Sequence, residues 1–108
     1  MTTDLAEAKR IAVASGSLGS RIGELRRLTD MKMRELDGLA GLRWGHVRYL
    51  ELEPRPGIQA ETLAKIANVF GVSLDWLYGR SEERASDRKV RAAVAAARAA
   101  ASGLRSAG

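Results

Sequence analysis

The most constraining feature of this sequence is a break at Gly41 between two helically spaced pairs of apolar residues. Leu36 and Ala40 lie four residues apart before the break, and Val47 and Leu50 lie three residues apart after it, so the members of each pair share one helix face. Glycine has no Cβ and readily adopts the left-handed conformation that ends one helix before another begins. The pattern predicts a helix-turn-helix, whose second helix has a shape that enters the DNA major groove.

Apolar spacing predicts one small all-α domain with an extension at each end. The well-spaced apolar residues run from Leu18 to Tyr78, about the smallest segment that buries an independent core. We therefore expect an N-terminal extension at residues 1–17 with a short helix, a helix-turn-helix domain at 18–79, and a basic, Ala-rich helical tail at 80–108.

Five helices are expected in the central part, over residues 19–29, 33–40, 44–52, 60–70 and 73–78. Pro54 and Pro56 cannot continue a helix, so they predict an exposed loop between the third and fourth helices. Gly71 is expected to end the fourth helix, and Ser73 is expected to cap the fifth.

The tail combines strong helix propensity over residues 88–101 with an expected helix end at Gly103. Three arrangements remain open: partial disorder, dimerisation through an apolar stripe, or a cationic arm on DNA. The stripe consists of Val90, Val94, Ala97, Ala101 and Leu104, and the arginines beside it, seven residues apart, are Arg84, Arg91, Arg98 and Arg105.

The net charge of +5 favours an anionic partner such as nucleic acid, and most of the excess lies in the tail. Residues 21–79 carry nine Lys or Arg against eight Asp or Glu, whereas residues 80–108 carry seven against three. The longest apolar run near the N-terminus, residues 11–14, is too short for a signal peptide or a membrane span, so we expect a cytoplasmic protein.

The sequence contains no pattern typical of an enzyme or a metal site. Cysteine is absent, which excludes disulfides and Cys-containing zinc sites. The single histidine, His46, lacks a second ligand or a nucleophile at a suitable spacing, and no Gly-rich phosphate loop is present. We therefore expect no catalytic activity, no metal and no cofactor.

Three segments of the chain carry a family pattern: Arg21-Ile22-Gly23-Glu24-Leu25-Arg26, Thr62-Leu63-Ala64-Lys65-Ile66-Ala67 and Val72-Ser73-Leu74-Asp75-Trp76-Leu77. With these segments the chain resembles the Cro/C1-type (XRE) helix-turn-helix proteins of phage repressors, bacterial regulators and some antitoxins. The resemblance implies a compact five-helix, lambda-repressor-like fold that binds double-stranded DNA.

The resemblance also implies a structural ion pair between Arg26 and Glu51. Each lies beside an apolar residue expected in the core, Leu25 or Leu50, so partial desolvation would favour a bidentate guanidinium–carboxylate pair. The alternative is two solvated charges that contribute little to stability.

Site residues follow by position from the resemblance. Arg48 is the strongest candidate for reading a base, because its guanidinium matches the two acceptors of guanine, whereas Trp44 could instead form a protein-binding surface. The implied base contacts are Trp44, Gly45, Arg48 and Tyr49. The implied phosphate contacts are Lys32, Arg34, Arg43 and Arg55.

The chain departs from the family pattern at four places. Met33 stands for a common Gln, Asp37 for a small Ala and Arg43 for a capping Ser or Thr, and the loop after Glu51 is longer and lacks its usual Gly. Two opposite effects are open for Asp37. It could stabilise the start of the next helix, or it could repel DNA phosphates.

We expect a transcriptional regulator, a repressor that binds a near-palindromic operator as a homodimer, because one helix reads only a few base pairs. The candidate dimer surfaces are the region around Trp76 and Tyr78 and the tail. The alternative is a protein-interaction module, antitoxin-like or antirepressor-like, that uses the helix-turn-helix as a scaffold.

Overall fold

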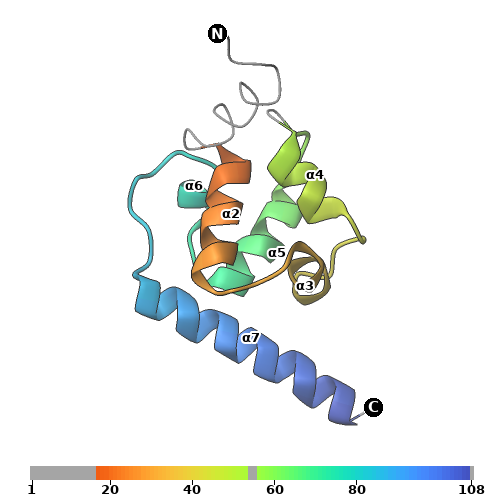
Figure 1. The fold of residues 1–108 in the computed structure, drawn as a ribbon. Helices are drawn as coiled ribbons and strands as arrows, with labels where there is room; N and C mark the ends of the chain where they lie inside the picture. Colours follow the sequence, from red (N-terminus) through yellow and green to blue (C-terminus); the bar gives the residue numbers. More distant parts are fainter. Residues whose placement is uncertain (1–16, 54–55, 108) are drawn as a thin grey trace, which may run out of the picture.

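The computed structural model describes residues 17–53 and 56–107, and the regular structure of these residues is entirely helical (Figure 1). The prediction of an all-α chain is confirmed for this part. None of its helices is long and apolar enough to cross a membrane. The helices are α2 (Leu18–Leu28), α3 (Met33–Leu39), α4 (His46–Leu52), α5 (Ala60–Phe70), α6 (Leu74–Leu77) and α7 (Asp87–Ala107). The helix expected within residues 1–17 lies outside the described residues.

Glycine conformations explain where the central helices begin and end. Gly41 has φ +68°, in the left-handed region that the sequence predicted for it, and Gly71, with φ +65°, ends α5 as expected. The predicted start of a helix at residue 44 is wrong, because Gly45 has φ +89° and forms the N-cap of α4. Trp44 therefore lies in the turn before α4.

The core forms where the apolar faces of α2, α3, α4 and α5 meet. Its fully buried side chains include Ile22 of α2, Leu36 of α3, Val47 and Leu50 of α4 and Phe70 of α5. The residues around Gly41 thus bury the same faces that their spacing predicted, and their burial sets the orientation of α3 and α4.

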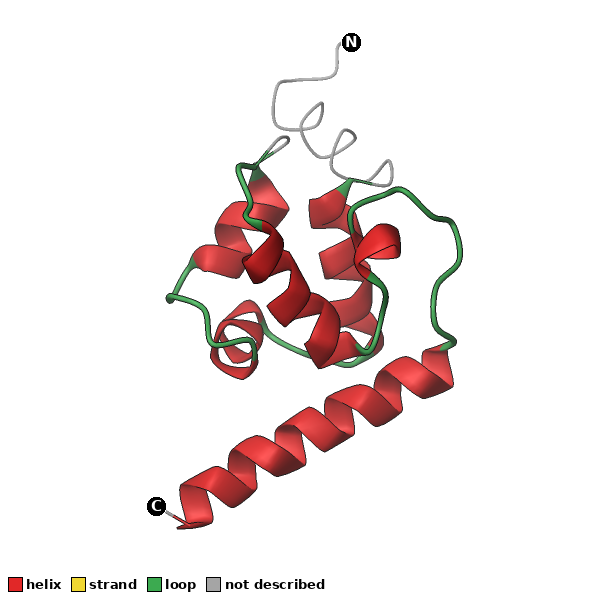
Figure 2. Ribbon diagram, turned by 180° about the vertical axis from the view of Figure 1, so that it is seen from behind, coloured by secondary structure: helices red, strands yellow, loops and turns green. Residues whose placement is uncertain are grey.

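Helix α7 packs against its own domain, along one side of the other helices (Figures 1 and 2). Val90 and Val94 are fully buried, and Ala97 packs against the same core. Contact with α5 is so close that a Cβ on Gly71 would lie 2.9 Å from the Cβ of Ala93. The N-terminal half of the stripe is thus covered within the chain, and this packing is none of the three arrangements expected for the tail.

Two further expectations from the C-terminal part are wrong. Gly103 does not end the tail helix but lies inside α7, because one glycine costs only about 1 kcal/mol among strong helix formers. Trp76 is buried, so it is unavailable as a dimer surface, whereas Tyr78 is half exposed.

The segment between α6 and α7 is anchored by Arg21, which is buried in α2. One guanidinium nitrogen of Arg21 donates to the carbonyl oxygens of Trp76, at 2.7 Å, and Ser81, at 3.1 Å. The other pairs with Glu82 at 3.0 Å, and the guanidinium lies 4.7 Å from the centre of the Trp76 ring. Arg21 therefore joins the beginning of the domain to the approach to α7.

Candidate nucleic-acid interface

Helix α4 has one buried face and one exposed face. Val47, Leu50 and Glu51 are buried against the domain, whereas Arg48 and Tyr49 are exposed. Because residues on opposite sides of a helix differ in this way, packing of the apolar face determines which side chains α4 presents to a partner.

The Arg26–Glu51 pair is present in the structure and supports α4 from behind. Nε of Arg26 donates to one carboxylate oxygen of Glu51, and Nη2 donates to the other at 2.9 Å. Nη1 of Arg26 also donates to the carbonyl oxygen of Met31 at 2.8 Å. This bidentate geometry joins α2, α4 and the turn before α3, so the pair supports α4 from within the domain and is not part of its exposed face.

The start of α4 is held by Asp37, which projects from α3. Its carboxylate accepts hydrogen bonds from the backbone N–H groups of Gly45 and Val47, both at 2.9 Å. Asp37 is only 4% exposed. The sequence left open whether Asp37 stabilises the start of the next helix or repels DNA phosphates. In the structure its carboxylate points to the start of α4 and is shielded from solvent.

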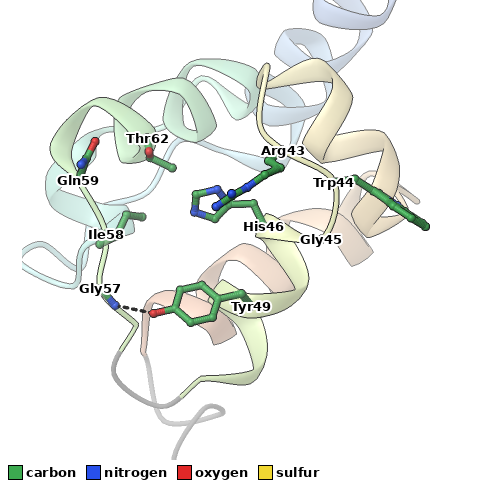
Figure 3. A pocket seen from close by; sticks show the side chains of 9 residues that line it. All are labelled: Arg43, Trp44, Gly45, His46, Tyr49, Gly57, Ile58, Gln59 and Thr62. Atoms are coloured by element: carbon green, nitrogen blue, oxygen red, sulfur yellow. Dashed lines mark hydrogen bonds between the residues drawn. The ribbon is translucent and has the colours of Figure 1, made fainter.

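An open cavity of about 690 Å³ lies between the start of α4 and the start of α5 (Figure 3). The hydroxyl of Tyr49 accepts a hydrogen bond from the backbone N–H of Gly57 at 2.9 Å, which connects α4 to the loop before α5. Arg48 is exposed on the same helix but does not line this cavity. The lining residues are Arg43, Trp44, Gly45, His46, Tyr49, Gly57, Ile58, Gln59 and Thr62.

Trp44 is the most exposed large apolar side chain of the described residues, at 74%. The guanidinium of Arg34, from α3, lies 5.0 Å from the centre of the Trp44 ring, within the range of a cation–π interaction. Arg34 and Trp44 therefore form a continuous surface from α3 to the turn before α4.

Exposed basic residues surround this turn. Lys32, Arg34, Arg43 and Arg48 are all exposed, and they come from the start of α3, the turn and α4. Arg55, the remaining expected phosphate contact, lies outside the described residues. The structure thus gathers four of the predicted basic contacts around one helix pair.

Three acidic side chains of the same region are engaged within the protein, whereas Asp30 and Glu53, before α3 and at the end of α4, are exposed. Asp37 and Glu51 are buried in the hydrogen bonds described above. Glu35 forms a bidentate pair with Arg98 of α7, at 2.7 and 3.0 Å, and this hydrogen bonding holds the pKa of Glu35 below its ordinary value despite the opposing effect of burial. The exposed charged side chains between the start of α3 and the first turn of α4 are therefore basic, namely Lys32, Arg34, Arg43 and Arg48.

Arg98 and Arg21 both connect separate parts of the domain, and neither role was predicted from the sequence. Arg98 also donates to the carbonyl oxygens of Thr29 and Asp30, at 3.2 and 3.4 Å. The spacing of the tail arginines, seven residues apart, could have indicated the role of Arg98. Arg98 lies beside the apolar stripe of α7, so its side chain lies close to the surface that the stripe contacts. For Arg21 we find no comparable signal in the sequence.

His46 lies half buried beside Tyr49, and their ring centroids are 6.3 Å apart. Within the part of the chain that the structure describes, no group of three His, Cys, Asp or Glu side chains could hold a metal ion. Comparison of the chain with protein-family models, with curated proteins and with solved structures finds no match.

Proposed function

We propose that this chain is a sequence-specific DNA-binding protein with a lambda-repressor-like helix-turn-helix, in which α4 is the recognition helix. The observation that carries the proposal is the arrangement of charge around α4. Lys32, Arg34, Arg43 and Arg48 are exposed, while the nearby carboxylates of Asp37 and Glu51 are buried in internal hydrogen bonds. Such a surface attracts the phosphate backbone and leaves the outer face of α4 available to bases.

The roles of the exposed residues follow from their chemistry. Arg48 reads a base, because its two parallel N–H donors match the acceptors of guanine in the major groove. Lys32, Arg34 and Arg43 bind phosphates and position α4, and the Trp44 ring contacts a thymine methyl or a sugar. The hydroxyl of Tyr49 already supports the loop at Gly57, so the outer edge of its ring is the part that faces DNA.

Within this function, we propose that the protein acts as a homodimer and represses transcription from a near-palindromic operator. Two recognition helices about 34 Å apart would read half-sites one helical turn apart. Within the described residues, Leu74 and Tyr78 of the α6 region remain exposed and apolar, whereas Trp76 is buried. The dimer contact is accordingly proposed at Leu74 and Tyr78.

The test is selection of bound sequences from a random duplex pool, followed by titration of Arg48→Ala on the selected site and on a scrambled site. We expect a loss of about 1 to 3 kcal/mol on the selected site and little change on the scrambled site, because base contacts carry sequence information. Arg91→Ala, an exposed arginine of α7, serves as the control. Equal losses on both duplexes would make Arg48 a phosphate contact only.

A second candidate function, a protein-interaction module, is favoured by one observation. Trp44, Tyr49 and Leu52 are all exposed large apolar residues in or next to α4. Exposed aromatic residues are typical of protein interfaces. A titration with duplex DNA at several salt concentrations separates the two functions, because phosphate binding weakens steeply with salt and a protein scaffold would show no duplex binding at all.

A further inference from the structure

We propose that Asp37 is the positioning residue that determines the sequence selectivity of α4. The inference rests on the proposed DNA-binding function and assigns selectivity to a side chain that is itself buried. Asp37 acts through the turn between α3 and α4, which it holds in a single conformation.

Three hydrogen bonds join Asp37 to this turn. Its backbone carbonyl oxygen accepts from the N–H of Leu42 at 2.7 Å, where α3 has ended. Its carboxylate oxygens accept from the N–H groups of Gly45 and Val47, at 2.9 Å each. One residue thus holds the chain at the beginning of the turn, at the N-cap of α4 and inside the first turn of α4.

The geometry requires two acceptors on one side chain. Oδ2 receives Gly45 and Oδ1 receives Val47, and the residue is 4% exposed, so water has little access to replace either bond. An asparagine would keep one acceptor but turn an NH₂ group towards a backbone N–H, which cannot accept a hydrogen bond. The negative charge of a carboxylate is also stabilised by the positive, N-terminal end of the α4 dipole.

Arg43 and Trp44 lie between the residues that Asp37 holds, and they are exposed because the turn directs them outward. Gly45 provides no side-chain cap of its own, and its φ of +89° is a conformation in which other residues are strained. The N-cap is thus Gly45 and not position 43, and Asp37 supplies the capping carboxylate from α3, so α4 requires no side-chain cap from Arg43. The orientation of Trp44, and of Arg48 one turn into α4, depends on the same hydrogen bonds.

The experiment compares Asp37→Asn and Asp37→Ser with Asp75→Asn. Asp75 is an exposed aspartate in the first turn of α6 and serves as a matched control for the chemical change. Each full-length variant is first shown to be folded by circular dichroism. Affinity is then measured on the selected duplex and on a scrambled duplex, and backbone hydrogen exchange is measured at Gly45 and Val47 without DNA.

For both Asp37 variants we expect a loss of about tenfold or more in the ratio of selected-site to scrambled-site affinity, with scrambled-site affinity nearly unchanged. Exchange at Gly45 and Val47 should accelerate by a similar factor, because each amide loses its acceptor. The Asp75 variant should change neither quantity. A role in fold stability alone would lower the unfolding midpoint without changing the ratio of affinities.

The inference is overturned if folded Asp37 variants keep the wild-type affinity ratio, or lose affinity equally on both duplexes. It is equally overturned if neither variant folds, because it requires a folded domain in which α4 is misplaced. If the wild-type protein selects no sequence, the proposed function fails. The exchange rates still report in that case whether Asp37 holds the turn, so the two failures are distinguishable.

Discussion

Glu51 and Glu61 lie in different environments although both are glutamates in helices of the same domain. Glu51 is 9% exposed and receives two hydrogen bonds from Arg26, which is itself 15% exposed. Glu61 is 77% exposed and lies 3.7 Å from Lys65 one turn away. Removal of one partner from a desolvated ion pair leaves the other charge buried without compensation. Water screens the charges of an exposed pair, so the loss of one partner costs little.

We expect Glu51→Ala to destabilise the protein by about 2 to 4 kcal/mol, because it leaves the largely buried guanidinium of Arg26 with only the Met31 carbonyl. Glu61→Ala, the matched control, should change stability by no more than about 0.5 kcal/mol. Chemical denaturation of both variants measures the difference. Equal midpoints with unchanged slopes would contradict the argument.

Among the helices, α3 and α7 are connected by the Glu35–Arg98 pair, which adds a charged contact beside the apolar packing of α7. Hydrogen bonding to Arg98 lowers the pKa of Glu35, so the folded protein ionises this carboxyl more readily than the unfolded chain does. The resulting stability is fully present above the ordinary pKa of a glutamate carboxyl, and it is lost as the pH falls through the lowered pKa of the folded state.

Arg98→Gln should therefore reduce stability at neutral pH and have a smaller effect in acid, and the pKa of Glu35 should rise towards its ordinary value. Thermal unfolding between neutral and acidic pH measures the first effect, and an NMR titration of the Glu35 carboxyl measures the second. Arg91→Gln, exposed on α7, is the control. A stability difference that does not vary with pH would show that Arg98 acts only through its contacts with backbone carbonyls.

Within the molecule as a whole, α7 belongs to the domain, because its buried valines are part of the same hydrophobic core as the other helices. Val90 and Val94 are 0% and 1% exposed, and burial of each contributes on the order of 1.5 to 3 kcal/mol. Small domains are stable by only about 5 to 15 kcal/mol, so α7 contributes a substantial share of the total.

Truncation after Arg80 should accordingly lower the unfolding midpoint of the whole domain, because it uncovers the part of α5 that packs on Val90 and Val94. Truncation after Gly103 keeps both valines and Arg98, so it should leave the midpoint nearly unchanged. Denaturant titrations of the two shortened chains provide the comparison. A stable domain that ends at Arg80 would mean that α7 docks without supporting the core.

The sequence by itself determined the features that depend only on residues close together in the chain. Apolar spacing located the helices, and Gly41 and Gly71 have the left-handed conformation that a chain reversal requires. The Arg26–Glu51 contact was also predictable, although from a resemblance and not from spacing. Each of these features depends on a repeat within one helix or on a familiar pattern of residue types.

Only the tertiary structure decided what covers the tail stripe and which group each charged side chain contacts. Arg98 donates to the carbonyl oxygen of Thr29 across 69 positions of the chain, and Arg21 donates to that of Trp76 across 55. Spacing within a helix shows which residues share a face, but the partner of that face depends on how all the helices pack together. The two bonds that Asp37 makes to α4 belong to the same class, because they exist only once α3 and α4 have packed against the core.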